Sequence, residues 1–348
     1  MSRSRSGLVM KFSLVIPVYN GGEVLKETLA SVRKCDPAPD ETIVVDDGST
    51  DETASIASSF GCRVIPLQGP LGPATARSRG AEAADGDVIV FTDADVLLPE
   101  DLFAHLQEDF AREEVSAVQG IFSRHCPFTD YCSDYKNLYN RFVLDALPDW
   151  IETTFTSLTA VRRDSFFASG GFDCNIRTPS VEDRTLGRNL TRFGASIFLD
   201  RRIEVVHNKR LTLFGFMRNQ FRRSRDLAKL LLRNRQEKCS TTQTPKSFNK
   251  QGRFGTNAPS TMARIPVAYL GLLSVMLTCQ WCPWAWIAVG VWFGLFVVLA
   301  LPFTGYLARQ RGWMFALAGL PLNLLDALVS GAGVAWGVLD FVFRKNRY

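Results

Sequence analysis

Asp93 and Asp95 are separated by one alanine and follow a short apolar run at residues 88–91. Two carboxylates this close repel each other unless a cation lies beside them, and their hard oxygens suit Mg²⁺ or Mn²⁺. Such a metal binds a substrate diphosphate and acts as a Lewis acid when the phosphate leaves. An aspartate that follows a strand can instead cap the next helix. The spacing of the two carboxylates predicts a site for a metal ion and a diphosphate. The surrounding sequence favours this interpretation over a helix cap.

A second acidic turn, Asp46 and Asp47, follows the apolar residues 42–45 and precedes Gly48-Ser49-Thr50-Asp51. A carboxylate does not attract a phosphate, but it accepts hydrogen bonds from a ribose hydroxyl or a base N–H. The alternative is a turn in which Ser49 and Asp51 cap a helix. We expect the residues of this motif to divide between the two roles.

Charged and titratable residues elsewhere in the sequence add three further groups of candidates. Arg77 and Arg79 lie at the start of an alanine-rich stretch, where a guanidinium can pair with a diphosphate, although at least one of them is expected to be a solvated helix charge. Glu182 and Asp183 offer a general base for a hydroxyl nucleophile, or acidic residues that complement a helix dipole. His207 closes a strand-like run and is either a third metal ligand or a structural histidine.

The elements that position these residues follow from the apolar pattern. Continuous apolar runs at residues 12–18, 42–45, 63–67 and 88–91 predict strands buried on both faces. Helical patterns lie between them at residues 23–34, 51–60 and 73–84, the second with Ser49 or Thr50 as its expected cap. Alternating strands and helices predict an α/β fold with a mostly parallel sheet, in which ligands bind beyond the carboxyl ends of the strands. Glycine-rich dinucleotide and phosphate-loop motifs are absent from the sequence, which disfavours those folds.

Together these segments resemble family-2 glycosyltransferases of the GT-A fold, over about residues 12–232. The resemblance is carried by SLVIPVYNGGEVLKETLASV, VVDDGSTDET, GPATARSRGAEAADGDVIVFTDAD and GGFD with a downstream ED, in the family's order. It implies a Rossmann-like sheet flanked by helices and a metal-dependent, inverting transferase of the hexosyltransferase type, with Mg²⁺ or Mn²⁺ as cofactor and a nucleotide-sugar as donor.

The resemblance also implies roles for individual residues. Asp183, with Glu182 beside it, is implied as the catalytic base. Metal binding is implied for Asp93, Asp95 and His207. The residues implied to line the nucleotide pocket are Pro17, Tyr19, Asn20, Asp46, Asp47, Arg77 and Asp93.

One departure from the family bears on the product. Processive synthases of this family carry Gln-x-x-Arg-Trp after the base, whereas here Gln220 and Arg223 are followed by Ser224. The missing tryptophan removes a stacking platform for a growing sugar chain, so single-sugar transfer is favoured. A catalytic base is needed when the attacking group of the acceptor is a hydroxyl. The implied base therefore favours a hydroxyl of a lipid-linked or saccharide acceptor. The alternatives are a polyprenyl-phosphate glycosyltransferase and an inactive nucleotide-sugar-binding membrane scaffold.

The charged residues are unevenly distributed along the chain. Of the 348 residues, 46% are hydrophobic and 22% are charged, which excludes a disordered chain, and the net charge of +5 does not suggest a nucleic-acid partner. Twelve Lys or Arg between residues 201 and 238 precede an apolar region, residues 263–343, with few charges. A membrane surface is the expected partner of this basic block.

We therefore predict a multi-pass protein of the inner cell membrane. The basic stretch predicts an interfacial amphipathic helix, and residues 265–282 and 284–307 are long enough to cross a bilayer. The third apolar region, residues 313–343, is either a span or a re-entrant hairpin bent near Pro321 to Asp326. Residues 1–10 contain two arginines and are not typical of a secretory signal, so the catalytic part is expected in the cytoplasm. The predicted parts are a disordered terminus (1–10), a GT-A domain (11–208), an interfacial helix (209–235), a linker (236–262) and a membrane region of about three segments (263–343).

Overall fold

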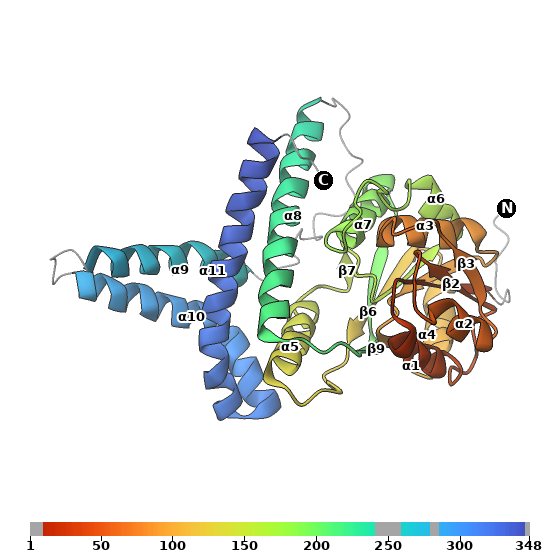
Figure 1. Ribbon diagram of the computed structural model, residues 1–348, viewed down its shortest axis with the longest axis horizontal. Coiled ribbons are helices and arrows are strands. Elements are labelled where there is room, and N and C mark those ends of the chain that lie inside the picture. The colour runs from red at the N-terminus through yellow and green to blue at the C-terminus, as the bar shows by residue number, and fades with distance from the viewer. Residues whose placement is uncertain (1–9, 241–258, 279–284, 345–348) are drawn as a thin grey trace. The chain divides into compact units, whose positions relative to one another are not determined.

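The computed structural model describes residues 10–240, 259–278 and 285–344 (Figure 1). The chain divides into two compact units. Unit 1 contains the described residues up to Phe128 together with Leu147–Lys209, and unit 2 contains Thr129–Ala146 and the described residues from Arg210 onward. The predicted disordered terminus falls almost wholly on residues 1–9, and much of the predicted linker falls on residues 241–258, so both lie outside the described residues.

Unit 1 is built on a sheet whose strand order is β3-β2-β1-β4-β8-β6-β9-β5, with β7 beside β9. Strands β3, β2, β1 and β4 are parallel, as predicted, but β8 runs antiparallel between β4 and β6. The sheet is therefore mixed rather than mostly parallel. Its strands are β1 (Phe12–Val18), β2 (Glu41–Asp46), β3 (Arg63–Pro66), β4 (Val88–Thr92), β5 (Val96–Leu97), β6 (Ala117–Phe122), β7 (Trp150–Ile151), β8 (Leu158–Arg162) and β9 (Ile197–His207).

Helices cover both faces of this sheet, as its buried apolar strands require. On one face Phe12 packs against Phe103, and on the other Phe91 packs against Phe166 and Phe172. Figure 1 shows α1, α2 and α4 on the first side and α3, α6 and α7 on the second. These helices are α1 (Gly22–Val32), α2 (Thr53–Ser59), α3 (Pro73–Ala83), α4 (Leu102–Phe110), α6 (Arg163–Ala168) and α7 (Glu182–Phe193).

The start of α2 differs from the sequence prediction. The residue before the helix is Glu52, and the predicted cap at Ser49 or Thr50 is wrong. The carboxylate of Asp51 lies closer to the helix and accepts a hydrogen bond from the Thr53 N–H at 3.1 Å. Ser49 is used elsewhere, because its Oγ accepts the N–H of Asn20 at 2.8 Å.

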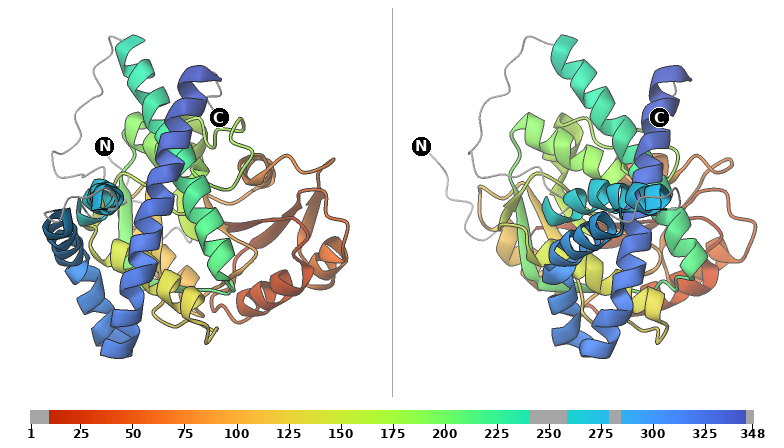
Figure 2. Two further views of the ribbon diagram at one scale, coloured as in Figure 1. Left: turned by 60° about the vertical axis from the view of Figure 1, so that its left-hand side comes forward. Right: turned by 90° about the vertical axis from the view of Figure 1, so that its left-hand side faces the viewer.

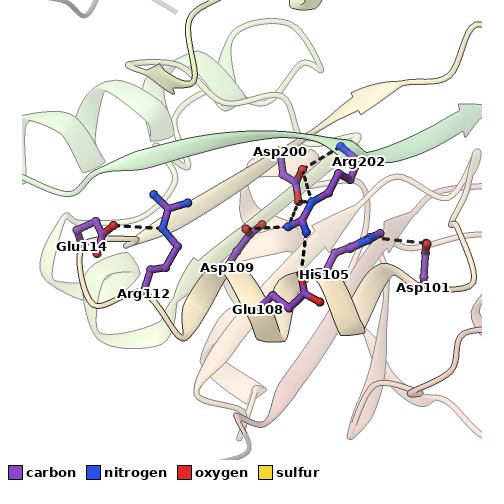
Figure 3. Close-up of polar contacts among 8 residues, drawn as sticks. All are labelled: Asp101, His105, Glu108, Asp109, Arg112, Glu114, Asp200 and Arg202. Carbon is purple, nitrogen blue, oxygen red and sulfur yellow. Dashed lines mark hydrogen bonds and ion pairs between the residues drawn. The ribbon is translucent and has the colours of Figure 1, made fainter. Parts of the chain in front are cut away.

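A buried acidic pair lies where α4 packs against β9 (Figure 3). Asp109 and Asp200 are both 3% exposed, and Arg202 contacts them at 3.1 and 2.8 Å. Burial and the nearby charge of Asp200 raise the pKa of Asp109 to about 7. Burial acts in the same direction on Asp200, but the hydrogen bonds from Arg202 outweigh it and lower the pKa of that carboxyl. The pair therefore carries one proton at mildly acidic pH.

We expect Asp109→Asn to change how the stability of unit 1 depends on pH. A folded-state pKa of about 7 means that Asp109 stabilises the fold at low pH and loses this contribution as pH rises from about 4 through 7. Asparagine cannot ionise, so the variant should gain at least about 1.4 kcal/mol over the wild type between pH 5 and pH 8. Denaturant unfolding at both values measures this, and parallel pH dependence of the two proteins would contradict it.

Unit 2 is a bundle of five described helices: α5 (Tyr131–Asp145), α8 (Leu213–Ser240), α9 (Pro259–Thr278), α10 (Ala285–Arg311) and α11 (Trp313–Phe343). The predicted GT-A domain, residues 11–208, included residues 131–145. Tyr135 and Tyr139 are core, because both pack against Phe303 of α10. This apolar face groups α5 with the C-terminal helices.

The described part of the predicted membrane region, residues 263–343, is helical except at Gly312, which separates α10 from α11. Among the described residues, Trp286–Arg311 and Trp313–Phe343 are long and apolar enough to cross a membrane, while Ala263–Val275 is a shorter apolar helix. α8 extends to Ser240, past the predicted end at Arg235, and α9 begins inside the predicted linker. Of the two alternatives left open for residues 313–343, the structure does not show the bend near Pro321, because α11 continues through this proline as one helix.

Small residues bring α8 and α11 into close contact. A Cβ added at Gly333 would lie 2.4 Å from the Phe221 carbonyl oxygen, and one at Gly337 would lie 2.3 Å from the Arg225 carbonyl oxygen. Gly333-x-x-x-Gly337 thus forms a flat strip on which the α8 backbone rests. The Cβ of Ser224 also faces this strip, 3.1 Å from the added Cβ of Gly333. A tryptophan at position 224 would not fit here.

Gly337→Leu should therefore separate α8 from α11. A leucine cannot be accommodated against backbone atoms, so we expect a lower melting temperature of the detergent-purified protein, equivalent to about 1–3 kcal/mol. Ala335→Leu is the matched control, because Ala335 lies on the exposed side of the same helix. Equal melting temperatures for the two variants would contradict the packing described.

Candidate active site

Three parallel strands of unit 1 end at the same edge of the sheet, and polar residues follow each of them. In β1 and β2, Val18 is in register with Asp46, and β4 lies on the other side of β1. Pro17 lies inside β1, and the half-exposed Tyr19 follows it. Asp93 and Asp95 follow β4. The edge predicted from the sequence therefore does gather these candidates.

Asn20 joins the first two of these turns. Its backbone has a φ of +47°, in the left-handed region that asparagine tolerates better than most residues. Its Oδ1 accepts the Thr50 N–H at 2.8 Å, and its own N–H donates to Ser49. Asn20 thereby fixes the loop after β1 to the acidic turn after β2 and leaves Tyr19 facing solvent.

Asp46 and Asp47 are buried, and their carboxylates accept hydrogen bonds from backbone N–H groups around them. Asp46 Oδ1 accepts the Ser49 N–H at 2.8 Å. The two oxygens of Asp47 accept the N–H groups of Leu71 and Gly72, each at 2.8 Å. Both carboxylates therefore hold the backbone of the loops that surround the edge of the sheet. The sequence predicted a structural role in this motif only for Ser49 and Asp51.

Gly72 shows how tightly the loop before α3 is held. Its φ is +96°, and an added Cβ would lie 2.2 Å from the carbonyl oxygen of Arg177. Only glycine fits there. The hydrogen bond to Asp47 and this close approach together set where α3 begins, and α3 carries Arg77.

Arg77 is the centre of the site. It is 3% exposed, its Nη2 lies 2.5 Å from Asp93 Oδ1, and its Nη1 lies 3.3 Å from Glu182 Oε1. Burial lowers the pKa of Arg77, but the charges of Asp93 and Glu182 outweigh it and raise that pKa above its ordinary value. Arg79 is instead an exposed partner of Glu82. Arg79 is thus the solvated helix charge that was expected of at least one arginine, and pairing of Arg77 with a diphosphate stays a prediction.

Glu182 and Asp183 open α7, as predicted, but their environments differ. Glu182 is buried, and besides Arg77 it accepts the Ser180 N–H at 2.7 Å. Asp183 is half-buried and accepts the N–H of Arg184 at 2.7 Å, while its carbonyl oxygen accepts the Thr154 hydroxyl. Glu182 is therefore held in place by the site, and Asp183 is the more accessible carboxylate of the two.

His207 and Asp95 come together through a strand pairing. β5 and β9 are antiparallel with Val96 opposite His207, and His207 Nε2 lies 3.6 Å from Asp95 Oδ1. Lys209 Nζ lies 3.0 Å from Asp95 Oδ2. Burial raises the pKa of Asp95, but His207 and Lys209 outweigh it and hold that pKa well below its ordinary range. Asp95 is therefore ionised at neutral pH.

Lys209 was not among the predicted site residues. The sequence placed it in the basic block that was interpreted as a membrane contact. Its position two residues after His207, at the end of the same strand, was the signal that could have identified it.

The donor set of this edge fits a hard divalent cation. Asp93 and Asp95 supply carboxylate oxygens and His207 supplies a ring nitrogen, all of which suit Mn²⁺, and the oxygens suit Mg²⁺. Within the described ranges, no three His, Cys, Asp or Glu side chains already converge on one point. Positive charge reaches the carboxylates from Arg77 and Lys209. A cation bound mainly by one or two carboxylates, water and substrate phosphates needs no complete protein cage.

Residues 13–169 match the model of Glycosyl transferase family 2, so the chain carries a glycosyltransferase domain of this family. The glycosyltransferase GlyG of Streptococcus pneumoniae is 31% identical over 115 residues, which are 32% of this chain and 38% of that protein. The O-antigen chain rhamnosyltransferase RfbN of Salmonella typhimurium is 27% identical over 216 residues, 58% of this chain and 68% of that protein. The chain spans well under two thirds of GlyG.

The fold has a counterpart among solved structures. The mannosyltransferase PcManGT from Pyrobaculum calidifontis, in complex with GDP-Man and Mn²⁺, superposes with a TM-score of 0.63 and 19% identity, covering 90% of this chain and 88% of that one. The GT-A fold predicted from the sequence is confirmed, and residues 13–169 match the predicted family.

Proposed function

We propose that this protein is a membrane-anchored, metal-dependent, inverting glycosyltransferase that moves one sugar from a nucleotide-sugar to a hydroxyl of a lipid-linked or saccharide acceptor. The observation that carries the proposal is the Arg77 centre, which joins the Asp-x-Asp turn to the start of α7. The family 2 domain and the Mn²⁺ in the solved structural neighbour support it.

Asp95, Asp93 and His207 would hold Mg²⁺ or Mn²⁺, and this ion would offset the negative charge that builds on the departing nucleoside diphosphate. Pro17, Tyr19 and Asn20 would line the nucleotide pocket. Asp46 and Asp47 act through the loops that they fix. Arg77 keeps Asp93 oriented and adds positive charge beneath the diphosphate.

Asp183 is the proposed catalytic base. It would take the proton from the acceptor hydroxyl as the oxygen forms its bond to the anomeric carbon on the face opposite the departing diphosphate, which inverts the configuration. Glu182 is a positioning residue in this account, because both of its oxygens are engaged by Arg77 and Ser180.

The nature of the acceptor follows from the need for a base. A sugar hydroxyl is barely acidic in water, whereas a polyprenyl phosphate is already ionised and needs no base. Single-sugar transfer is favoured by Ser224, because that position lies on the packed α8–α11 strip and offers no stacking platform. The apolar helices of unit 2 support a multi-pass anchor in the inner membrane, with the catalytic unit in the cytoplasm.

Product analysis tests the acceptor assignment. The protein is incubated with a membrane lipid extract and labelled nucleotide-sugars, and the product is treated with mild acid. A hydroxyl acceptor gives an acid-stable glycosidic bond, whereas a polyprenyl-phosphate acceptor gives an acid-labile phosphodiester. An acid-labile product would overturn the proposed acceptor and leave the transferase activity intact.

His207→Ala should weaken metal binding. Losing one of the three proposed ligands is expected to lower the Mn²⁺ affinity about 10-fold or more, because few protein groups contribute to the site. Titration of Mn²⁺ in the presence of a nucleoside diphosphate, followed by electron paramagnetic resonance, measures this. His105→Ala is the control, because His105 lies on α4. Equal affinities for both variants would remove His207 from the site.

A further inference from the structure

The two sides of α11 differ in chemistry. Successive residues turn by about 100° around a helix, which puts Asp326, Gly333, Gly337 and Asp340 on one side. All four are buried. The opposite side is apolar. Near the two ends of the helix it is exposed, at Leu317, Pro321, Ala332, Ala335, Val338, Leu339 and Val342. Between them, Leu328 and Gly331 contact Tyr269 of α9.

The buried side of α11 is covered by α8. Besides the glycine strip, Gln220 donates to Asp326 at 2.5 Å and Lys229 lies 2.5 Å from Asp340. Residue numbers rise together along the two helices, so the helices run parallel. Figure 1 shows α8 and α11 next to each other, and Figure 2 shows that they cross at an angle. The acidic residues of the apolar region are thus partners of a polar helix.

α8 carries exposed cations on both sides of the stretch, Gln220 to Lys229, that contacts α11 and also within it. Arg218, Arg223 and Arg235 are exposed, and the first and last lie about 25 Å apart at about 1.5 Å per residue. The hydrocarbon core of a bilayer is about 30 Å thick, and a charged side chain within it is costly. If α11 crossed the membrane upright, α8 would bring these arginines into the core.

α9 and the first part of α10 point in another direction. They pack against each other through Val267, Ala268 and Phe296, and their outer surfaces are apolar. Figure 1 shows this pair running across the direction of α8 and α11. Pro302 lies inside α10, where a proline kinks a helix, and the second part of α10 returns to α11. If the hairpin of α9 and α10 lies along the membrane normal, α8 and α11 therefore lie in the membrane plane.

We infer that α11, although long and apolar enough to be a span, lies flat in the membrane surface. Its exposed apolar side enters the lipid, and α8 covers its water side with the basic residues at the level of the anionic headgroups. The α9–α10 hairpin alone enters the hydrocarbon core. This inference rests on the membrane anchoring proposed above and is independent of the reaction.

Spin labels along the exposed side of α11 test the inference. Leu317→Cys, Ala332→Cys and Val342→Cys are made in a background in which the eight native cysteines are replaced. The labelled full chain is reconstituted in vesicles of phosphatidylethanolamine and phosphatidylglycerol, and label depth is measured from collisions with oxygen and with a water-soluble nickel chelate. Trp286→Cys, Phe293→Cys and Leu301→Cys on α10 are the matched controls, because these three residues are also exposed and apolar.

We expect the collision ratios of the three α11 labels to agree within about twofold, because a helix lying in the interface keeps one depth, while the α10 labels show a gradient. A ratio at Ala332 about tenfold above both ends would mean that α11 crosses the bilayer and would overturn the inference. Dipolar broadening that disappears on dilution with unlabelled protein would put a second copy on this side and also overturn it. If the chain fails to float with vesicles at all, the membrane anchoring itself is wrong.

Discussion

Asp183→Asn is expected to lower the turnover of the nucleotide-sugar about 10²–10⁴-fold, the usual contribution of a positioned general base. Asparagine has nearly the same shape and its Oδ1 can still accept the N–H of Arg184, so α7 should begin as before. Because the base touches the acceptor rather than the nucleotide, the affinity for the nucleoside diphosphate should stay within about twofold. Steady-state kinetics and calorimetry measure the two quantities.

Asp164→Asn is the matched control for this variant. Asp164 lies in the first turn of α6, as Asp183 lies in the first turn of α7, and it is exposed. Its replacement should leave turnover unchanged. Retained turnover in Asp183→Asn would indicate an acceptor that is already ionised, such as a phosphate. Loss of both turnover and nucleotide binding would indicate that the substitution had disturbed the fold.

Arg77→Met should destabilise unit 1 by about 3–5 kcal/mol, because it leaves the buried carboxylate of Glu182 without its cation. Asp93 would lose its 2.5 Å partner as well, so donor turnover should also fall. Arg79→Met, two residues along the same helix, changes only an exposed pair with Glu82 and should alter stability by less than about 1 kcal/mol. Thermal unfolding of the two variants compares them directly.

A double variant separates charge from packing. If the cost of Arg77→Met comes from the uncompensated charge of Glu182, adding Glu182→Gln should restore part of the lost stability. If the two effects simply add, the buried ion pair is not what stabilises this part of the site. Turnover should stay low in the double variant, since the positive charge that we propose to offset the diphosphate is still missing.

The parts of the fold that local pattern determines were predictable. β1, β2 and β4 read as continuous apolar runs because both faces of each strand are buried, and the structure confirms them within one or two residues. The capping of α2 was not predictable, because Ser49, Thr50 and Asp51 are all good caps and the choice depends on where Asn20 lies. When several neighbouring residues could cap a helix, the tertiary structure determines which of them does.

Contacts between distant residues account for most of what the sequence did not reveal. Arg77 meets Glu182, 105 positions away, only because the loops before α3 and α7 converge. The membership of α5 in unit 2 depends on Phe303, which lies in a helix that the sequence marked only as apolar. Asp326 and Asp340 are acidic residues in an apolar region, and the sequence did not reveal that Gln220 and Lys229 of α8 are their partners.

The measurement that tests the central claim most directly is release of nucleoside diphosphate by the detergent-purified protein across a panel of nucleotide-sugars. It is run with Mg²⁺ or Mn²⁺, with a chelator, and with Asp95→Ala. The account predicts release from one donor that is lost on chelation and in the variant, because Asp95 is an ionised carboxylate in the proposed metal site. Release that survives both treatments would contradict the metal site. Absence of release from every donor, with lipids present and nucleotide binding intact, would contradict the transferase and favour a nucleotide-sugar-binding scaffold.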